Sequence, residues 1–259
     1  MKTALTPHLI LSASLLIACQ CLAADAIRFQ SGPEAVQLLE LYTSEGCSSC
    51  PPAEKWFSEL KRSPKLWTEV VPVAFHVDYW DNLGWKDVLA SKVFTKRQYR
   101  YSDVWHSQSV ATPGFVVDGK NWQGWFRQEP VPGMDKRVAG VLCVAAQDGG
   151  RWELRFAPDL KLKQSGYDLH VALLGFEIKT NVRAGENSGR MLDHDFVTVA
   201  FAEGPAERSG DVWQRSFKLE ASAGVFPQRT GLAAWVTPAG VMAPLQAAGG
   251  WIPNGSAKP

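Results

Sequence analysis

The pattern of hydrophobic and polar positions divides the chain of 259 residues into two parts that meet near residue 150. In the first part, residues 34–42 and 70–77 are mostly apolar, as in strands that are covered on both faces. Between them, residues 53–60 carry apolar side chains at helical spacing directly after two prolines, which the first turn of a helix tolerates. The pattern predicts a strand, a helix and a second, parallel strand.

Three further elements are expected before residue 150. Residues 86–101 have the spacing of a helix, and residues 114–118 that of a strand, which ends in the hairpin signal Asp118-Gly119. Residues 134–147 are apolar at helical spacing and are followed by two glycines, which predicts another helix. We therefore expect an α/β domain over residues 34–148.

After residue 150 the pattern changes to short apolar runs separated by Gly, Pro, Asn and Ser. No long helical pattern interrupts them, so they predict a β-rich C-terminal domain over residues 151–248, either an antiparallel sheet or a small sandwich. Residues 249–259 are rich in Gly and Pro and are expected to form a loose tail. The predicted strands are residues 151–157, 167–179, 196–202, 212–219 and 232–236.

The N-terminal residues 1–23 have the composition of a cleaved signal peptide. Lys2 precedes an apolar run over residues 9–18 that is too short to span a membrane, and small residues follow at 23 and 24. Residues 16–19 also resemble a lipobox, so a lipid anchor at Cys19 is the alternative. Both interpretations place the protein outside the cytoplasm, as a periplasmic or secreted protein or as a membrane-anchored lipoprotein, where disulfides persist.

The charge balance and the motifs present argue against two kinds of ligand, nucleic acid and an organic cofactor. The chain has 27 Lys and Arg against 26 Asp and Glu, and no run of like charges, so nothing indicates nucleic-acid binding. It also lacks a glycine-rich phosphate loop, so no organic cofactor is expected.

Two cysteines carry the candidate chemistry. Cys47 and Cys50 are three positions apart at the predicted turn from strand to helix, where the helix dipole stabilises a thiolate. Cys47 is the expected nucleophile, and Cys50 the thiol that resolves a mixed disulfide. The arrangement predicts thiol–disulfide exchange with protein or small-molecule thiols and disulfides, and leaves the direction of electron flow open.

This part of the chain also resembles known proteins. Residues 34–148, with the two cysteines between a strand and a helix, resemble a thioredoxin-like fold. Residues 41–52, 76–80 and 185–199 resemble an exported thioredoxin-like family known as domain of unknown function 1223. This second resemblance extends over nearly all of the chain after the signal peptide, and it implies a family rather than an activity.

The thioredoxin-like resemblance implies roles for three further residues. A cis proline is expected to face the cysteines, and Thr112-Pro113 stands just before a predicted strand, where this pair shapes the substrate cleft. Thioredoxins also place a buried carboxylate below the cysteines, and Glu40 is the candidate proton acceptor for Cys50. Glu40 is one residue further from the cysteines than that pattern requires, so its side chain has a second interpretation as a solvent-facing or salt-bridged group.

Two other functions compete with exchange. Cys47 and Cys50 are candidate ligands for copper or zinc with His76 or His106 and Cys143, but the chain lacks a second ligand pair, so no metal site is predicted. Alternatively, the cysteines form a static disulfide in a non-catalytic binding module. A disulfide across two residues closes too short a loop to stabilise much, which favours chemistry.

One polar segment in the second part has two interpretations. Residues 183–194 are rich in glycine and charge, as in a surface loop. Alternatively, Glu186, Asn187 and Arg190 hold the two predicted domains together.

Overall fold

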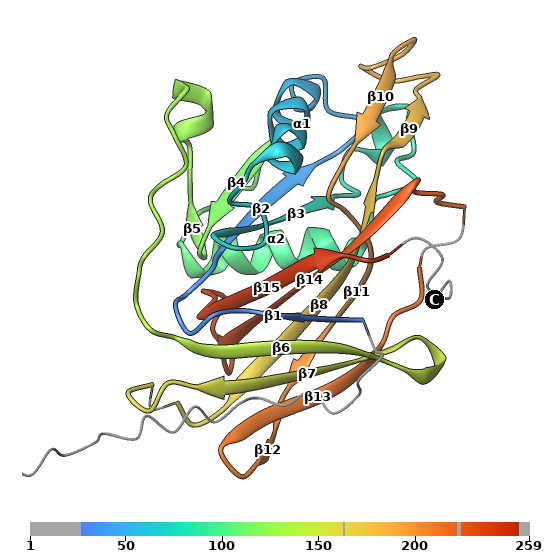
Figure 1. Ribbon diagram of the computed structural model, residues 1–259. Helices are drawn as coiled ribbons and strands as arrows, with labels where there is room; N and C mark the ends of the chain where they lie inside the picture. Colours follow the sequence, from blue (N-terminus) through green and yellow to red (C-terminus); the bar gives the residue numbers. More distant parts are fainter. Residues whose placement is uncertain (1–26, 163, 222–223, 254–259) are drawn as a thin grey trace, which may run out of the picture.

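The computed structural model describes residues 27–162, 164–221 and 224–253, and these residues form a mostly β protein (Figure 1). They contain fifteen strands, two α-helices and four short 3-10 helices. The predicted signal peptide, its cleavage site and the lipid-anchor position Cys19 lie outside the described residues. Over the described part of the chain, no helix has the length and apolar character needed to cross a membrane.

A large sheet of eight strands runs through the molecule in the order β15-β14-β8-β11-β3-β2-β4-β5. Strands β2 and β3 are parallel, and β3 also pairs in parallel with β11 through Ala74 and Val197. Strands from both sides of residue 150 therefore belong to one sheet. The strands are β2 (Gln37–Thr43), β3 (Val70–His76), β4 (Gly114–Val117), β5 (Lys120–Asn121), β8 (Tyr167–Phe176), β11 (Val197–Pro205), β14 (Arg229–Pro238) and β15 (Gln246–Trp251).

The predicted fold class is therefore wrong. We expected an α/β thioredoxin-like domain followed by a β-rich domain, but the strands expected in the first join those of the second in one sheet. The reason is that β3 is buried along its whole length and takes a second neighbour from the C-terminal part of the chain. The start of the predicted loose tail, residues 249–251, belongs to β15.

A second sheet of five antiparallel strands packs against the C-terminal strands of the large sheet (Figure 1). Its apolar face, which includes Leu142, Leu154 and Phe217, shares a core with Leu169 and Leu232 of the large sheet. Burial of this apolar area drives the two sheets together. The strands are β1 (Arg28–Gln30), β6 (Gly140–Gln147), β7 (Arg151–Pro158), β12 (Glu207–Ser209) and β13 (Val212–Lys218).

The helix predicted over residues 134–147 is wrong, because residues 140–147 form strand β6. β6 lies between β1 and β7 and hydrogen-bonds to both. A short apolar run fits helical and extended spacing equally well, so the pairing partners decide the outcome. Those partners lie in the segments before and after the run.

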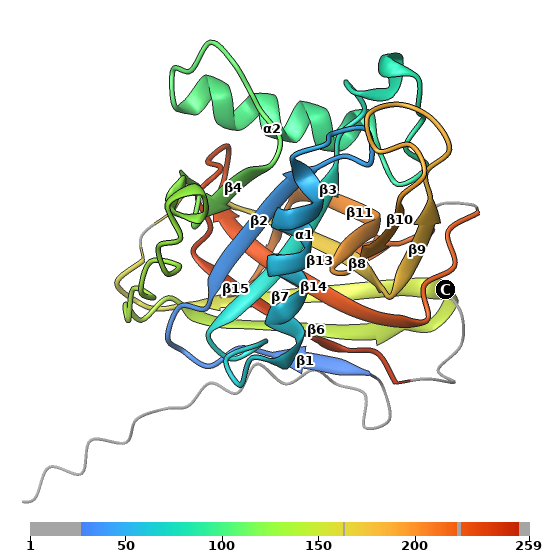
Figure 2. The same cartoon turned by 90° about the horizontal axis from the view of Figure 1, so that it is seen from above.

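The two α-helices lie on opposite faces of the large sheet (Figure 2). Phe57 of α1 (Cys50–Glu59) packs on Phe115 of β4, while Phe94 of α2 (Lys92–Val104) packs on Phe75 of β3. The two helices predicted from apolar spacing are therefore confirmed, although α2 begins later than predicted. The short helices are η1 (Leu60–Arg62), η2 (Asp81–Leu83), η3 (Gly124–Arg127) and η4 (Asp148–Gly150).

A small hairpin joins the C-terminal half to α1. Strands β9 (Ile178–Asn181) and β10 (Met191–His194) form a two-stranded sheet of their own within the described residues, and β10 packs beside α1. The connecting loop, residues 182–190, lies at the end of the molecule where α1 begins (Figure 1). This hairpin brings C-terminal side chains to the two cysteines.

Candidate functional site

The two cysteines of the predicted motif form a disulfide at the start of α1, with their Cα atoms 5.4 Å apart. Cys47 lies in the turn after β2, where its N–H donates to the carbonyl of Ser44, and Cys50 is the first residue of the helix. Prolines follow at 51 and 52, in the first turn of the helix. A backbone N–H at these positions has no acceptor within the helix, so its absence in proline costs no helical hydrogen bond. Both cysteines are fully buried.

The Thr112–Pro113 peptide bond is cis, as predicted, and it lies against the disulfide. Sγ of Cys47 is 3.6 Å from the carbonyl oxygen of Thr112 and 3.3 Å from Oγ of Ser49. The side chain of Thr112 accepts a hydrogen bond of 2.8 Å from Nε1 of Trp80. Four predicted site residues, Cys47, Cys50, Thr112 and Pro113, therefore lie together.

Glu40, the fifth predicted site residue, lies on the other face of the sheet. It is fully buried and forms an ion pair with Arg97 of α2, and it also accepts a hydrogen bond of 3.1 Å from the hydroxyl of Tyr42. Thr43, the neighbour of Tyr42, instead points to α1 and donates to Glu54. Side chains alternate along a strand, so Glu40 shares the α2 face with Tyr42.

A buried group of carboxylates and histidines, which sequence reasoning missed, lies on the α1 face between α1, β3 and β10. Its members, called the histidine–carboxylate cluster below, are Glu45, Glu54, His76, Asp87 and His194. Glu45 and Glu54 flank the two cysteines in the sequence, whereas His194 comes from the C-terminal half. Sequence reasoning considered His76 as a candidate metal ligand beside the cysteines and gave His194 no role.

Glu54 is the centre of this cluster. Its Oε2 is 2.5 Å from Nδ1 of His194, and its Oε1 accepts a hydrogen bond of 2.5 Å from Thr43. Burial raises the pKa of Glu54, but the charge and hydrogen bond of His194 hold it below its usual value. Burial in turn lowers the pKa of His194, but the opposing effects of Glu54 and Glu45 raise it to about 10.

Each histidine also lies beside a carboxylate other than that of Glu54. Nδ1 of His76 is 2.8 Å from Oδ2 of Asp87, and Nε2 of His194 is 3.3 Å from Oε1 of Glu45. Asp87 also accepts from the N–H of Glu45, and Glu45 accepts a hydrogen bond of 2.7 Å from Nε1 of Trp85. The ligand atoms of Glu54, His76 and His194 all lie within 4.8 Å of one another, which makes these three residues a candidate metal-binding group.

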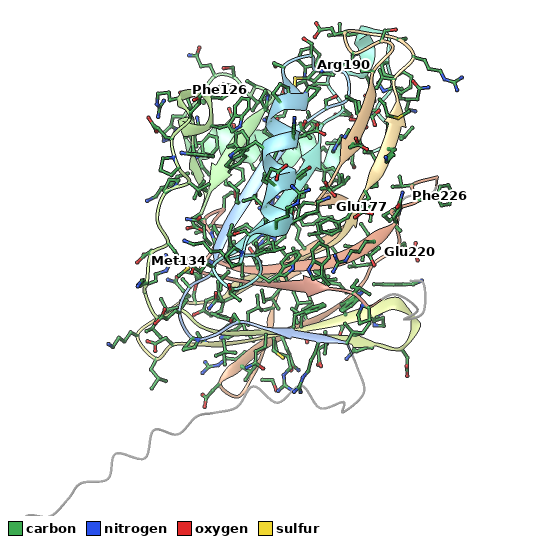
Figure 3. All side chains as sticks on the ribbon, turned by 45° about the horizontal axis from the view of Figure 1, so that its top comes forward. Phe126, Met134, Glu177, Arg190, Glu220 and Phe226 are labelled. Carbon is green, nitrogen blue, oxygen red and sulfur yellow. A yellow bond between two sulfur atoms is a disulfide. The ribbon has the colours of Figure 1, made fainter. Side chains whose placement is uncertain are left out.

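The β9–β10 loop contacts the turn that carries Cys47. Nδ2 of the buried Asn187 donates to the carbonyl oxygens of Glu45 and Cys47, at 2.8 and 2.9 Å. Arg190 donates to Oδ1 of Asn187, and Glu186 accepts from the N–H of Ser48. Figure 3 labels Arg190 at this end of the molecule. The contacts agree with the interpretation that this segment holds two parts of the chain together.

A cleft of about 390 Å³ opens beside the cis proline. Trp105, Trp122 and Phe126 contribute to its wall together with Pro113, and Phe126 is exposed. A second hollow, of about 420 Å³, lies between the first turn of α1 and the 3-10 helix η3, and Trp56 lines it. Aromatic side chains thus line one hollow beside the cis proline and another beside α1.

The alternative metal set proposed from the sequence is not assembled. His106 is exposed just beyond the end of α2, and Cys143 lies on β6 in the five-stranded sheet. Within the described residues, His76 bonds to Asp87 rather than to either cysteine, and its ring lies against the ring of His194. The candidate metal group therefore consists of histidines and a carboxylate rather than thiolates.

The fold and the site define a mostly β protein that carries a disulfide-bonded Cys-Ser-Ser-Cys segment beside a cis proline. The chain belongs to the family described as protein of unknown function (DUF1223), whose model matches residues 38–237. This match confirms the resemblance to that family, and it bears on neither export nor a thioredoxin-like fold. Comparison with curated proteins finds none with significant similarity.

Two solved structures share the fold. The crystal structure of protein AGR_C_4864 from Agrobacterium tumefaciens is 24% identical, with a TM-score of 0.55, over 88% of this chain and 98% of that one. HBP35 of Porphyromonas gingivalis is 13% identical, with a TM-score of 0.53, over 88% of this chain and 80% of that one. At these identities the similarity concerns the fold alone.

Proposed function

We propose that the protein is a thiol–disulfide oxidoreductase that uses Cys47 and Cys50. The observation that supports this most is the position of the disulfide at the start of α1, with Sγ of Cys47 3.6 Å from the carbonyl oxygen of Thr112. A thiolate formed at Cys47 would lie at the positive end of the helix dipole, which lowers the pKa of a cysteine there.

The exchange runs in two balanced steps. A substrate thiolate attacks Sγ of Cys47, a mixed disulfide forms, and the Cys47–Cys50 bond breaks with its electron pair on Cys50. A second substrate thiolate then attacks the substrate sulfur of the mixed disulfide and releases Cys47 as a thiolate. Two electrons pass from the substrate dithiol to the protein, and the protons lost by the substrate thiols are balanced by protonation of the two cysteines. The reverse sequence reduces a substrate disulfide.

Thr112 and Pro113 act as positioning residues in this proposal. The Thr112 carbonyl faces Cys47, and the aromatic cleft beside Pro113 suits a peptide or a small thiol with apolar groups. Because Cys47 is fully buried, a substrate must displace part of its cover, and Trp80 and the 182–190 loop both contact this turn.

Glu40 is not given the role of proton acceptor in this proposal. Its ion pair with Arg97 on the opposite sheet face supports a structural role instead. The proposed compartment is the periplasm or the exterior of the cell, because a disulfide of this kind persists under oxidising conditions. The proposed partners are the thiols and disulfides of proteins or small molecules.

The reduction potential of the disulfide tests the proposal. Purified protein is equilibrated in glutathione buffers, its thiols are trapped, and the masses are measured. A reversible couple between about −120 and −270 mV, the span of known thiol–disulfide catalysts, is expected. A disulfide that stays intact below about −300 mV would instead identify a structural staple in a binding module.

A matched pair of variants assigns the two roles. Cys50→Ser is expected to accumulate a mixed disulfide at Cys47 when incubated with a glutathione disulfide, because the resolving thiol is missing. Cys47→Ser leaves Cys50 at the first helical position and is expected to accumulate at least ten times less adduct. Equal labelling of the two variants would contradict the assignment of Cys47 as the nucleophile.

A further inference from the structure

We propose that Glu54, His76 and His194 bind a divalent transition-metal ion, with Zn²⁺ as the preferred ion. The three residues come from α1, β3 and β10, all three are buried, and one ligand atom of each lies within 4.8 Å of the others. Thr43 and Asp87 fix the side chains from outside this group. This site is distinct from the cysteines and does not depend on the proposed exchange reaction.

The observation that points most directly to a ligand is the environment of Nε2 of His76. This atom is buried and has no hydrogen-bond partner within the described part of the chain, while Nδ1 of the same ring is held by Asp87 at 2.8 Å. A buried polar atom without a partner is costly and calls for an explanation. A histidine whose Nδ1 donates to a carboxylate presents the Nε2 lone pair, which is the arrangement of histidine ligands in metal sites.

His194 has the same arrangement with the nitrogens exchanged. Its Nδ1 faces Glu54 at 2.5 Å, and its Nε2 faces Oε1 of Glu45 at 3.3 Å. Each ring therefore has one nitrogen towards the centre of the group and the other towards an outer carboxylate. Trp85 holds that outer carboxylate of Glu45 at 2.7 Å. A metal ion would replace the direct contact between Glu54 and His194.

The charge of the cluster also favours a cation. Glu45, Glu54 and Asp87 are buried carboxylates, and among the described residues no Lys or Arg forms a recorded ion pair with any of them. Buried charges require a compensating partner. Metal ligation requires neutral histidines, and the three carboxylates then carry three negative charges; a divalent ion would compensate two of them in place of the protons that the histidines otherwise carry.

The donor set selects the class of metal. Two imidazoles and one carboxylate suit Zn²⁺ and its neighbours Co²⁺ and Ni²⁺, whereas Ca²⁺ and Mg²⁺ prefer sites made of oxygen atoms. Three protein ligands leave room for a further ligand in a tetrahedral site. We therefore use Co²⁺ as a spectroscopic probe of the proposed zinc site.

The test uses the full protein with its disulfide intact, so that no thiolate is available as a ligand. After chelator treatment and buffer exchange, Co²⁺ is added and its visible absorption is recorded. One equivalent is expected to bind with the absorption of a four- or five-coordinate ion, and Zn²⁺ is expected to displace it. Absence of stoichiometric Co²⁺ and Zn²⁺ binding to this protein would overturn the proposal.

Variants locate the ion. His76→Gln and His194→Gln are each expected to weaken Zn²⁺ binding by more than about 100-fold, and Asp87→Asn by about 10- to 100-fold. His170→Gln is the control, because His170 is also buried but bonds to Glu203 and Thr237 elsewhere. Equal loss in the control, or full retention of binding in His76→Gln, would refute the site.

X-ray absorption of the zinc-loaded wild-type protein gives an answer even where a variant fails to fold. Scattering from two imidazoles and an oxygen ligand is expected. Sulfur ligands would overturn the proposal and would point to the cysteines instead. Because the reduction potential is measured separately, failure of the metal site leaves the proposed exchange reaction unaffected, and the reverse also holds.

Discussion

Two buried polar networks lie on opposite faces of the same sheet, and they differ in how their charge is compensated. On the α2 face, Glu40 pairs with Arg97, and the guanidinium group of Arg97 also lies over the rings of Phe75 and Trp235. On the α1 face, the histidine–carboxylate cluster has no recorded Lys or Arg partner among the described residues. The negative charge on the α2 face is thus compensated by a permanent cation, Arg97, whereas the negative charge on the α1 face requires a proton on histidine or a metal ion for its compensation.

This difference separates a structural network from a candidate site. The Arg97 network is closed, because Glu203 reaches Arg97, Arg100 and His170, and all of these partners are protein groups. The α1 network instead keeps a buried imidazole nitrogen of His76 without a partner. The α2 face therefore has the character of a structural network, while the α1 face, where the cysteines also lie, carries the two proposed sites.

The largest effect is expected from removing the permanent cation. Arg97→Met leaves Glu40 buried without its charge partner and is expected to lower the free energy of unfolding by about 3–5 kcal/mol. Urea denaturation measures this loss. Arg100→Ala is the control, because Arg100 is largely exposed and its pair with Glu203 contributes at most about 1 kcal/mol. Equal losses in the two variants would contradict the comparison.

A smaller loss is expected at the contact between the hairpin loop and the cysteine turn. Asn187→Ala removes the donors to the carbonyls of Glu45 and Cys47 and leaves both carbonyls without this partner, which we expect to cost about 2 kcal/mol. The cover over Cys47 is also expected to loosen, so that dithiothreitol reduces the disulfide about ten times faster. Both changes are measured on the oxidised protein.

Ser188→Ala provides the matched control for this variant. Ser188 is the exposed neighbour of Asn187, and its hydroxyl donates to the carbonyl of Arg183 in the same loop. Its stability and reduction rate are expected to equal those of the wild type. An unchanged reduction rate in Asn187→Ala would show that the loop does not limit access to Cys47.

The smallest effect concerns acid stability on the α2 face. Burial raises the pKa of Glu203, but its hydrogen bond with His170 and the charges of His170, Arg97 and Arg100 outweigh burial and lower the pKa to about 2. A carboxyl group with a lowered pKa stabilises the fold above its unfolded pKa, and this contribution is lost as the pH falls from about 4.5 towards 2. Solvent screening reduces the effect to about 1–2 kcal/mol.

Glu203→Gln tests this acid dependence. The variant is expected to be less stable than the wild type at pH 7 and to lose less stability between pH 4.5 and pH 2, as measured by urea denaturation at several pH values. Identical slopes of stability against pH in the two proteins would show that Glu203 does not contribute there.

Local patterns in the sequence predicted the local parts of the fold. The apolar spacing around residues 37–76 is sufficient to define β2, α1 and β3, because a buried strand followed by two prolines and an amphipathic run has one regular solution. The cis geometry at Pro113 followed from the resemblance. The same spacing argument failed at β6, whose apolar run fits both a helix and a strand.

The assembly of the large sheet was beyond local patterns. Val197 pairs with Ala74, and the sequence of neither segment indicates that the other is its pairing partner. The candidate site was missed for the same reason, because Glu54, His76 and His194 meet only through that pairing and through the β9–β10 hairpin. Glu40 was the opposite case, since its offset of one residue from the thioredoxin pattern already allowed a salt-bridged position for its side chain, and one residue along a strand changes the face of the sheet.

The pairing of β3 with β11 also has a consequence for how the chain folds. β3, which carries His76, keeps one edge open until residue 197 has reached it, so the sheet around the cysteines cannot be completed during synthesis of the first half. Contacts between such distant residues slow folding, because a long loop must close before they form. A chain that is still being synthesised therefore carries its two cysteines without the cover that Asn187 provides, and the proposed metal site assembles among the last parts of the molecule.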